Sequence, residues 1–306
     1  MTSFPDYVQF YPTIRCNKSC DFCFNGGLHE MEDMHVTKMM MMVDKLKGIG
    51  TRTIDIMGGE PTLHKDLAIF VSYAMDKAMG INISSNGSGN GLLNSIQDSC
   101  PDALIGISIN SREDITKAAD SVRQKGLLVK TVVGRNKDET MLSDILSMGA
   151  TATNLIYMDE MAPDGIGATL PFDEFYFWIR EAFGGNGAAP VFCSGFLPDT
   201  DTYPSLRNKR CPAGTTKVGI MPDGSVYPCN LFFGFPEFRI GNIFTSSFDE
   251  IWGNEILSFF RDFDGNLCPR KDCRLHAMCH GGCPAHSYSH FGDLAAPEPR
   301  CVTMSQ

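Results

Sequence analysis

The sequence has few basic residues and no long apolar run. Its 26 lysines and arginines are outnumbered by 36 aspartates and glutamates, so the formal net charge is -10. A chain with this charge repels a phosphate backbone, which argues against a nucleic-acid partner. No apolar stretch reaches the roughly 18 residues of a membrane helix, and the first residues lack the basic and apolar regions of a signal peptide. We therefore expect a soluble, cytoplasmic protein without a membrane partner.

Cysteine, in contrast, is abundant, with twelve in a chain of 306 residues. The composition is otherwise that of a globular protein, with 43% hydrophobic and 20% charged residues. In a reducing compartment so many cysteines are not expected to form disulfides, so metal ligation is the first hypothesis. Three lie between Cys16 and Cys23 and eight between Cys193 and Cys301. Cys100 stands alone, as expected for a buried structural thiol.

From residue 6 to about residue 159, short β-rich runs alternate with segments of helical periodicity. The predicted strands are 7–13, 52–57, 81–85, 103–109, 127–133 and 152–158. The predicted helices that follow them are 37–47, 67–79, 92–98, 113–125 and 139–147. Such an alternation forms a parallel sheet, because parallel neighbours need crossover connections. Six units are fewer than the eight of a closed barrel, so we expect an α/β fold with a partial (β/α)6 TIM-type barrel and a site at the carboxyl ends of its strands.

The chain changes character after residue 163. An aromatic-rich helix is predicted at 172–183, and the glycine-rich stretch behind it indicates a domain boundary near residue 185. We therefore expect a barrel domain at 1–185 and a small cysteine-rich domain at 186–306. Periodicity fails in the second domain apart from a β-hairpin at 217–229, so metal clusters are expected to hold it together.

Three cysteines follow directly on the first predicted strand, in the pattern C-x3-C-x2-C. This position puts Cys16, Cys20 and Cys23 at the end of the barrel where such folds place their chemistry. Three thiolates without a nearby fourth leave one iron of a [4Fe-4S] cluster open to a substrate or cofactor. The alternative is a structural zinc site that a distant residue such as His29 or His35 completes.

The pattern resembles that of the radical S-adenosylmethionine (SAM) enzymes, whose signature C-x3-C-x-aromatic-C follows the first strand of a partial (β/α)6 barrel. The resemblance implies that the three cysteines hold a [4Fe-4S] cluster, that SAM chelates its fourth iron, and that electron transfer into SAM yields methionine and a 5′-deoxyadenosyl radical. The residues implied to contact SAM are Phe22 at the adenine, the segment Gly58, Gly59, Glu60 and Pro61, then Ser85 and Asn86, and Ser108. Glycines suit a backbone that approaches a ligand closely, and Glu60 offers a carboxylate to the SAM amino group.

The cysteines of the second half resemble the SPASM (twitch-like) extension of radical SAM enzymes. Seven match its order, with four residues in place of two after the third: Cys211, Cys229, Cys268, Cys273, Cys279, Cys283 and Cys301. The resemblance implies two auxiliary [4Fe-4S] clusters. One would take Cys211, Cys229, Cys283 and an upstream cysteine, and the other Cys268, Cys273, Cys279 and Cys301.

Cys193 is the candidate for the upstream ligand, and the alternative is an auxiliary cluster with an open iron. With Cys193, eleven cysteines serve three clusters, as expected when SAM occupies one of roughly twelve irons. Zinc stays a competing interpretation, because the same region contains His276, His280, His286 and His290.

The resemblance also implies a class of reaction. Auxiliary clusters remove a substrate electron or bind the substrate, and either use favours net oxidation, such as dehydrogenation or crosslink formation. SPASM enzymes act mainly on peptides and proteins, so we expect a peptide or protein substrate and an electron donor of the flavodoxin or ferredoxin type. Asn230 follows Cys229 where sulfatase-maturing members carry an acidic base, and an amide cannot accept a proton at neutral pH. Other candidate acids are Asp159, Glu160 and Asp164.

Three further expectations concern partners and alternatives. Only fifteen residues precede Cys16, so no leader-peptide-binding domain is expected ahead of the barrel, and a separate recognition protein or direct docking would serve instead. The same chemistry on a small metabolite, such as a tetrapyrrole or sugar, is the second hypothesis. A non-catalytic iron–sulfur or zinc protein is the third.

Overall fold

A computed structural model of the chain describes residues 4–180, 188–191, 211–262, 267–268, 271–273, 276 and 281–301. The chain is divided into two compact units. The first comprises Met1–Val129, Ser147–Thr151 and Ala213–Arg261, and the second comprises Lys130–Leu146, Ala152–Pro212 and Asp262–Gln306. The hairpin predicted at 217–229 therefore belongs to the same unit as the first four predicted strands.

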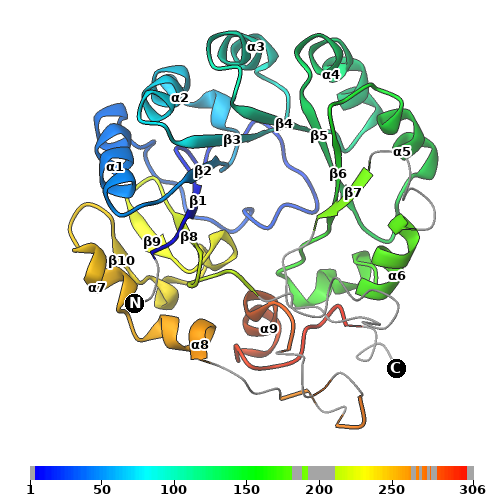
Figure 1. Ribbon diagram of the computed structural model, residues 1–306. Coiled ribbons are helices and arrows are strands. Elements are labelled where there is room, and N and C mark those ends of the chain that lie inside the picture. Colours follow the sequence, from blue (N-terminus) through cyan, green and yellow to red (C-terminus); the bar gives the residue numbers. More distant parts are fainter. Residues whose placement is uncertain are drawn as a thin grey trace. The chain divides into compact units, whose positions relative to one another are not determined.

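A mostly parallel sheet runs through the first unit (Figure 1), with its strands in the order β10-β9-β8-β1-β2-β3-β4. β1 pairs in parallel with both β2 and β8, whereas β8, β9 and β10 are joined antiparallel. The hairpin β8–β9 thus extends the sheet next to β1. The strand bounds are β1 Tyr7–Phe10, β2 Thr53–Ile56, β3 Gly80–Ser85, β4 Leu104–Ser108, β8 Lys217–Ile220, β9 Ser225–Tyr227 and β10 Gly241–Asn242.

Helices α1 to α4 follow strands β1 to β4 in the chain. α1 buries Met39, Met42, Val43 and Leu46, whose spacing of i, i+3, i+4 and i+7 puts them on one face. The helices of this unit are α1 Val36–Gly48, α2 Leu67–Asp76, α3 Asn90–Ser99, α4 Arg112–Lys125, α7 Phe248–Trp252 and α8 Ile256–Asp262, with 3-10 turns η1 Pro61–Leu63, η5 Asn230–Phe232 and η6 Pro236–Phe238.

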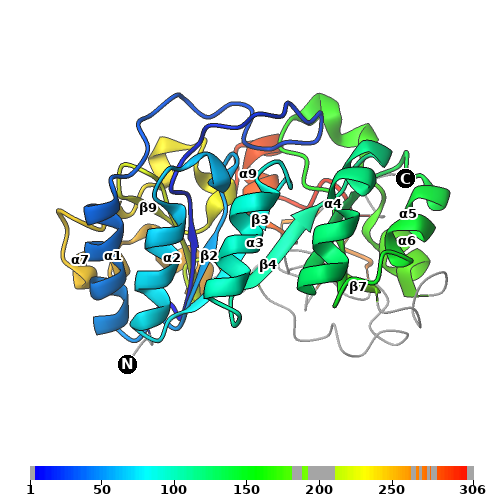
Figure 2. The same ribbon diagram turned by 90° about the horizontal axis from the view of Figure 1, so that it is seen from above.

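The segment between β1 and α1, residues 11–35, lies at the carboxyl ends of β2 and β3 (Figure 2). Figure 2 shows it in blue, running across that edge of the strands. A parallel β/α sheet places its functional side chains at this edge. The fold therefore brings the first group of cysteines to the residues that follow β2 and β3.

In the second unit the strands lie in the order β5-β6-β7, with β6 and β7 parallel. Its core includes the ring of Tyr157, which lies 4.6 Å from the ring of Phe175. The bounds are β5 Leu128–Val133, which enters this unit at Lys130, β6 Thr153–Tyr157, β7 Ala188–Val191, α5 Glu139–Leu146, η2 Pro163–Ala168, α6 Phe172–Trp178 and α9 Pro284–Phe291. Among the described residues, no helix has the length and apolar character that crossing a membrane requires.

The predicted α/β class with a mostly parallel sheet is confirmed, as are all six predicted strands and the hairpin. The sequence shows no periodicity after residue 185 apart from the hairpin, yet residues 211–262 also form short helices. There α7 and α8 bury Ile251, Trp252 and Leu257, so apolar packing also supports this segment. Its elements have two to seven residues, too few for a period to be visible in the sequence. The domain boundary near residue 185 stays a prediction.

Candidate functional site

Cys16, Cys20 and Cys23 lie on the segment that follows β1. Cys16 and Cys23 are exposed, and Cys20 is half-buried. The N–H of Cys23 donates to the carbonyl of Cys20 at 3.0 Å, which closes a tight turn. Burial raises the pKa of the Cys20 thiol, and the neighbouring Cys23 adds to this shift more than Cys16 does. Three thiols on one loop form a donor set that suits an iron–sulfur cluster.

Gly58 and Gly59 allow the cysteine loop to lie directly against the end of β2. Gly59 N–H donates to the carbonyl of Thr13 at 3.2 Å, and Glu60 N–H donates to that of Arg15 at 2.7 Å. A Cβ atom on Gly59 would lie 2.1 Å from the Arg15 carbonyl oxygen, and Gly58 has a φ of +127°. A larger residue at either position requires the backbone to move. In addition to any approach to SAM, these glycines accommodate the backbone of the cysteine loop.

The fully buried carboxylate of Glu60 links the ends of β2 and β3. Its Oε1 accepts from the N–H and hydroxyl of Thr62 at 3.1 and 2.6 Å and from the hydroxyl of Ser85 at 2.8 Å. Its Oε2 accepts from Asn86 N–H at 2.6 Å. The structure thus brings together three of the predicted SAM contacts. A carboxylate has about four lone-pair sites, and these four donors occupy them, so Glu60 is a structural link between the two strand ends. Its contact with SAM stays a prediction.

Asn86 connects the end of β3 to the cysteine loop. Its side-chain amide donates to Asn17 Oδ1 at 2.9 Å and to Cys16 Sγ at 3.8 Å. Its carbonyl accepts from Lys18 Nζ at 3.3 Å, and Lys18 pairs with Asp114 at 2.5 Å. Although burial opposes it, the hydrogen bond from Lys18 holds the pKa of Asp114 below its ordinary value. Asn17 and Lys18 were not predicted from the sequence, because the cysteine pattern fixes no residue type at these positions.

The other predicted SAM contacts lie on the same unit. Pro61 is buried and opens η1. Phe22 is half-buried in the turn between Cys20 and Cys23, and Ser108, also half-buried, ends β4. Their contact with SAM stays a prediction.

A chain of hydrogen bonds runs from the β8–β9 hairpin to the glycine segment. The side chain of Asn230, which is buried behind Cys229, donates to the hydroxyl of Tyr11 at 3.3 Å. That hydroxyl donates to Asn25 Oδ1 at 3.2 Å, and the Asn25 amide donates to the carbonyl of Gly58 at 3.2 Å. Burial is the main cause that raises the pKa of Tyr11, so its hydroxyl stays protonated at neutral pH. Sequence reasoning missed Tyr11 and Asn25, which carry no motif.

The predicted ligands of the auxiliary clusters are distributed over both units. Cys229 is buried in the first unit and Cys283 in the second. Cys193 and Cys279 lie outside the described residues. The half-buried members in the second unit are Cys211, Cys268, Cys273 and Cys301.

The prediction for Cys100 is confirmed. Its thiol is buried and lies 3.8 Å from the hydroxyl of Ser72. It is therefore a structural thiol of the first unit.

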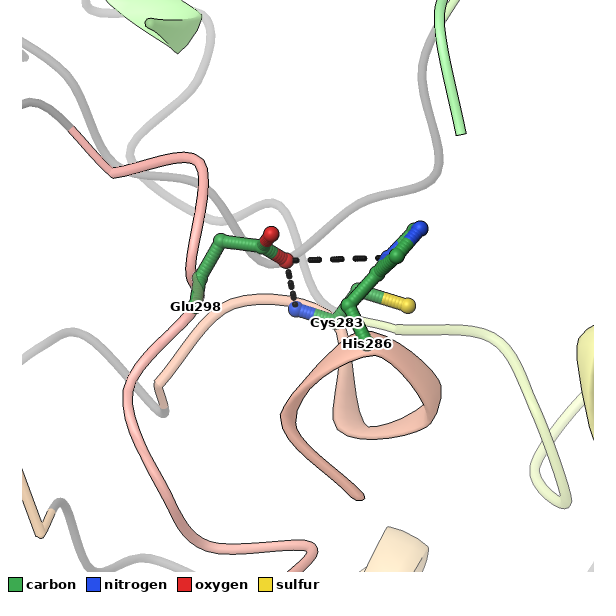
Figure 3. Close-up of side chains that lie close together, drawn as sticks. All are labelled: Cys283, His286 and Glu298. Carbon is green, nitrogen blue, oxygen red and sulfur yellow. Dashed lines mark hydrogen bonds and ion pairs between the residues drawn. The ribbon is translucent and has the colours of Figure 1, made fainter. Parts of the chain in front are cut away.

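Cys283, His286 and Glu298 meet in the second unit (Figure 3). Cys283 directly precedes α9, and His286 lies in the first turn of that helix. One metal-ligating atom from each of the three buried side chains lies within 4.8 Å of the other two. Cys283 N–H donates to Glu298 Oε2 at 3.0 Å, and His286 Nδ1 lies 3.8 Å from the same oxygen.

Arg300 supplies the positive charge of this group. Its Nε donates to Glu298 Oε1 and its Nη2 lies against His286 Nδ1, each at 2.8 Å. A guanidinium only donates, so Nδ1 accepts and the ring proton is on Nε2, which lies 3.4 Å from Asp159 Oδ1. A single metal ion between His286 and Glu298 would have to displace this cation. We therefore regard the thiol of Cys283 as the member of the group that suits iron.

Burial opposes the charges of both Glu298 and Arg300, but the attraction between them outweighs it. The pKa of Glu298 is held below its ordinary value by the charge of Arg300. The pKa of Arg300 is raised, first by Glu298 and then by Asp159. Both side chains are therefore charged at neutral pH, which makes them a buried ion pair.

Three of the histidines named for the zinc alternatives, His35, His276 and His290, each use one ring nitrogen in a hydrogen bond. His35 Nδ1 caps α1 by accepting from Thr37 N–H at 3.3 Å. His276 contacts the carbonyl of Cys268 at 3.1 Å, and His290 contacts that of His286 at 3.0 Å. His280 lies outside the described residues. A metal-ligating histidine commonly hydrogen-bonds a carbonyl through its other ring nitrogen, so these contacts are compatible with zinc as well as with iron.

Two family models match the chain in the two regions where the cysteines gather. The model described as the radical SAM superfamily matches residues 10–126, which include the cysteine loop, Glu60 and Asn86. The model described as an iron-sulfur cluster-binding domain, SPASM, matches residues 211–284, from Cys211 to the start of α9.

Curated relatives align over nearly the whole chain. A mycofactocin maturase of Mycobacterium ulcerans is 25% identical over 336 residues, which cover 95% of this chain and 86% of the relative. A PqqA peptide cyclase of Granulibacter bethesdensis is 24% identical over 332 residues, which cover 95% and 85%. An AdoMet-dependent heme synthase of Nitratidesulfovibrio vulgaris is 24% identical over 347 residues, which cover 96% and 91%.

Among solved structures, SuiB of Streptococcus suis bound to the precursor peptide SuiA has the same fold. The TM-score is 0.76 at 16% identity, over 98% of this chain and 76% of SuiB. The two matched family models therefore coincide with the cysteine loop after β1, its contacts with the ends of β2 and β3, and the second cysteine group. The chain belongs to the radical SAM superfamily and is a radical SAM enzyme of the SPASM type.

Proposed function

We propose that the enzyme oxidatively modifies a side chain of a peptide or protein, by dehydrogenation or by forming a crosslink. The observation that carries the proposal is the full-length alignment with a mycofactocin maturase and a PqqA peptide cyclase. The presence of a second cysteine group behind the SAM-binding region supports an oxidation, because it offers iron that removes a substrate electron.

The residues of the first unit have assigned roles in this proposal. Cys16, Cys20 and Cys23 hold one [4Fe-4S] cluster and leave its fourth iron to SAM, which supplies a 5′-deoxyadenosyl radical when bound. Glu60 and Asn86 fix the ends of β2 and β3 against the cysteine loop, which supports a precisely placed SAM. The further proposed SAM contacts are Phe22, Gly58, Gly59, Pro61, Ser85 and Ser108.

The finer parts of the proposal concern clusters, domains and partners. We place the SAM domain at 1–185 and the SPASM domain at 186–306, with two auxiliary [4Fe-4S] clusters. One takes Cys193, Cys211, Cys229 and Cys283, and the other takes Cys268, Cys273, Cys279 and Cys301. The proposed partners are a flavodoxin or ferredoxin-type electron donor and a separate leader-peptide-binding protein, and the proposed location is the cytoplasm.

Anaerobically reconstituted enzyme tests the proposal directly. It is incubated with SAM, dithionite and the short peptides encoded beside its gene, and both 5′-deoxyadenosine and peptide mass are measured. The proposal expects 5′-deoxyadenosine together with a peptide that has lost hydrogen. Absence of 5′-deoxyadenosine would contradict the SAM chemistry, whereas its formation without any peptide change would contradict the substrate class.

The second candidate is the same chemistry on a small metabolite. The full-length alignment with an AdoMet-dependent heme synthase favours it, since that relative is named for a tetrapyrrole product. Asn230 is neutral and buried, so this position carries no acid. It therefore does not favour a peptide substrate over a small molecule. Incubation with candidate tetrapyrroles in place of peptides distinguishes the two hypotheses.

A further inference from the structure

Glu298 holds the backbone of two cysteines at once. Its carboxylate oxygen Oε2 accepts from Cys283 N–H at 3.0 Å, and its carbonyl accepts from Cys301 N–H at 3.1 Å. Figure 3 shows the carboxylate pointing at the backbone nitrogen of Cys283. The resemblance to the SPASM extension assigns these two cysteines to different auxiliary clusters. One residue thus lies between candidate ligands of both.

The surroundings of Glu298 fix its position. It is 3% exposed and stands between Pro297 and Pro299, whose rings restrict the backbone on both sides. Gly282 has a φ of +91°, and a Cβ atom there would lie 2.3 Å from the Cβ of Glu298. The absence of a side chain at Gly282 therefore lets Glu298 approach the residue next to it, Cys283.

Arg300 anchors Glu298 to the end of β6. It donates to Glu298 Oε1 at 2.8 Å, to the carbonyl of Met158 at 2.7 Å and to Asp159 Oδ1 at 3.2 Å. Its guanidinium carbon lies 4.5 Å from the ring centre of Tyr157. Because a buried ion pair loses much of its energy when one partner moves, this frame resists displacement.

We propose that Glu298 is a positioning residue for the auxiliary clusters, which fixes the Cys283 and Cys301 ligands and places a negative charge beside the cluster that Cys283 serves. The inference rests on the proposed auxiliary clusters. Reduction of a cluster adds negative charge, so a carboxylate nearby opposes reduction and its removal favours it.

Two substitutions separate the geometry of Glu298 from its charge. Glu298→Gln removes the charge and keeps one oxygen, which accepts from Cys283 N–H when the NH2 group is turned toward Arg300. Glu298→Asp keeps the charge but withdraws the oxygen from Cys283. Both are made in a background in which Cys16, Cys20 and Cys23 are alanine, so that the iron and the paramagnetic signals come from the auxiliary clusters alone. Glu250→Gln is the control, because Glu250 is exposed and caps α7 through Ser247.

Iron per chain and the midpoint potentials from an anaerobic redox titration are measured for each. We expect about eight irons in the background and in Glu298→Gln, with a higher midpoint potential for one cluster in the latter. Glu298→Asp is expected to retain about four irons, because the cluster served by Cys283 is lost. The same iron content and potentials in both variants as in the background would overturn the positioning role. If the background protein with Cys16, Cys20 and Cys23 replaced by alanine binds no iron, the proposal of auxiliary clusters is itself overturned. This outcome is distinguishable because it is measured before Glu298 is changed.

Discussion

The N–H of Asn86 lies 2.6 Å from Oε2 of Glu60 and donates to it, which joins the end of β3 to the end of β2. The side chain of Asn86 also donates to Cys16 Sγ at 3.8 Å. A single residue therefore separates the buried carboxylate from Cys16, a proposed cluster ligand. A change at Glu60 is expected to reach both the SAM segment and the cysteine loop.

Glu60→Gln is predicted to weaken both SAM binding and the fold. The glutamine NH2 group would face donors from Thr62, Ser85 or Asn86, so one buried hydrogen bond becomes a mismatch. We expect SAM affinity and the free energy of unfolding to fall by about 1–3 kcal/mol each, with iron content unchanged. Calorimetric SAM titration and urea midpoints measure the two effects. Glu113→Gln is the control, because Glu113 is exposed. Unchanged SAM affinity and stability in Glu60→Gln would mean that the segment from Gly58 to Pro61 is an ordinary turn.

Gly59→Ala is predicted to displace the cysteine loop. The new Cβ would lie 2.1 Å from the Arg15 carbonyl oxygen, so the backbone before Cys16 must move. We expect reconstituted protein to lose about four irons and the ability to cleave SAM. Gly91→Ala on α3 is the matched control, because no atom lies within 4 Å of a Cβ there. Equal iron content in the two variants would contradict the prediction.

The number of clusters is predicted from the ligand count. Anaerobic reconstitution should give about 11 to 12 irons per chain, and replacing Cys16, Cys20 and Cys23 with alanine should remove about four of them together with all SAM cleavage. Cys100→Ala is the control, because this buried thiol lies against Ser72. Zinc in place of iron in freshly expressed protein would contradict the assignment of both cysteine groups.

Much of the fold was predictable because its first half repeats one strand and one helix. The pattern of α1 is visible in the sequence, since Met39, Met42, Val43 and Leu46 mark one face over several turns. β7 was missed because its AAPV sequence contains none of the aromatic residues, and only one of the β-branched residues, that indicate a strand.

The site was predictable where a motif fixes the residue and unpredictable where only packing does. The cysteine pattern and the glycine segment identified the loop and its neighbour. Tyr11, Asn25 and Arg300 carry no motif, and their roles follow from contacts with residues far away in the sequence. Gly59 is a third case. The sequence predicted a close approach to its backbone, but it did not identify the backbone of Arg15 as the close neighbour.

Cys193→Ala tests the ligand set of the first auxiliary cluster. If Cys193 closes that cluster, its removal leaves one iron without a protein ligand, which alters the electron paramagnetic signal and weakens iron retention. We expect this result, because Cys193 completes the count of eleven ligands. Cys100→Ala should leave the spectrum unchanged. A silent Cys193 variant would mean that the wild-type cluster already has an open iron, able to take a substrate thiolate or carboxylate.

Tyr11→Phe is predicted to break the link between the β8–β9 hairpin and the glycine segment. The Tyr11 hydroxyl accepts from the side chain of Asn230 and donates to that of Asn25, so its removal takes a partner from two polar groups at once. The expected loss is about 1–3 kcal/mol in the free energy of unfolding, the cost of a buried polar group left without its partner.

Tyr73→Phe provides the matched control for this last prediction. Its hydroxyl binds the exposed carboxylate of Asp44 at 2.9 and 3.0 Å, where water replaces the lost contact. We expect its free energy of unfolding, measured from the urea midpoint, to stay within about 0.5 kcal/mol of the wild-type value. Equal midpoints for the two variants would show that the Tyr11 hydroxyl contributes nothing. A loss confined to Tyr11→Phe would identify this buried hydroxyl as the connection between the residue behind Cys229 and the carbonyl of Gly58.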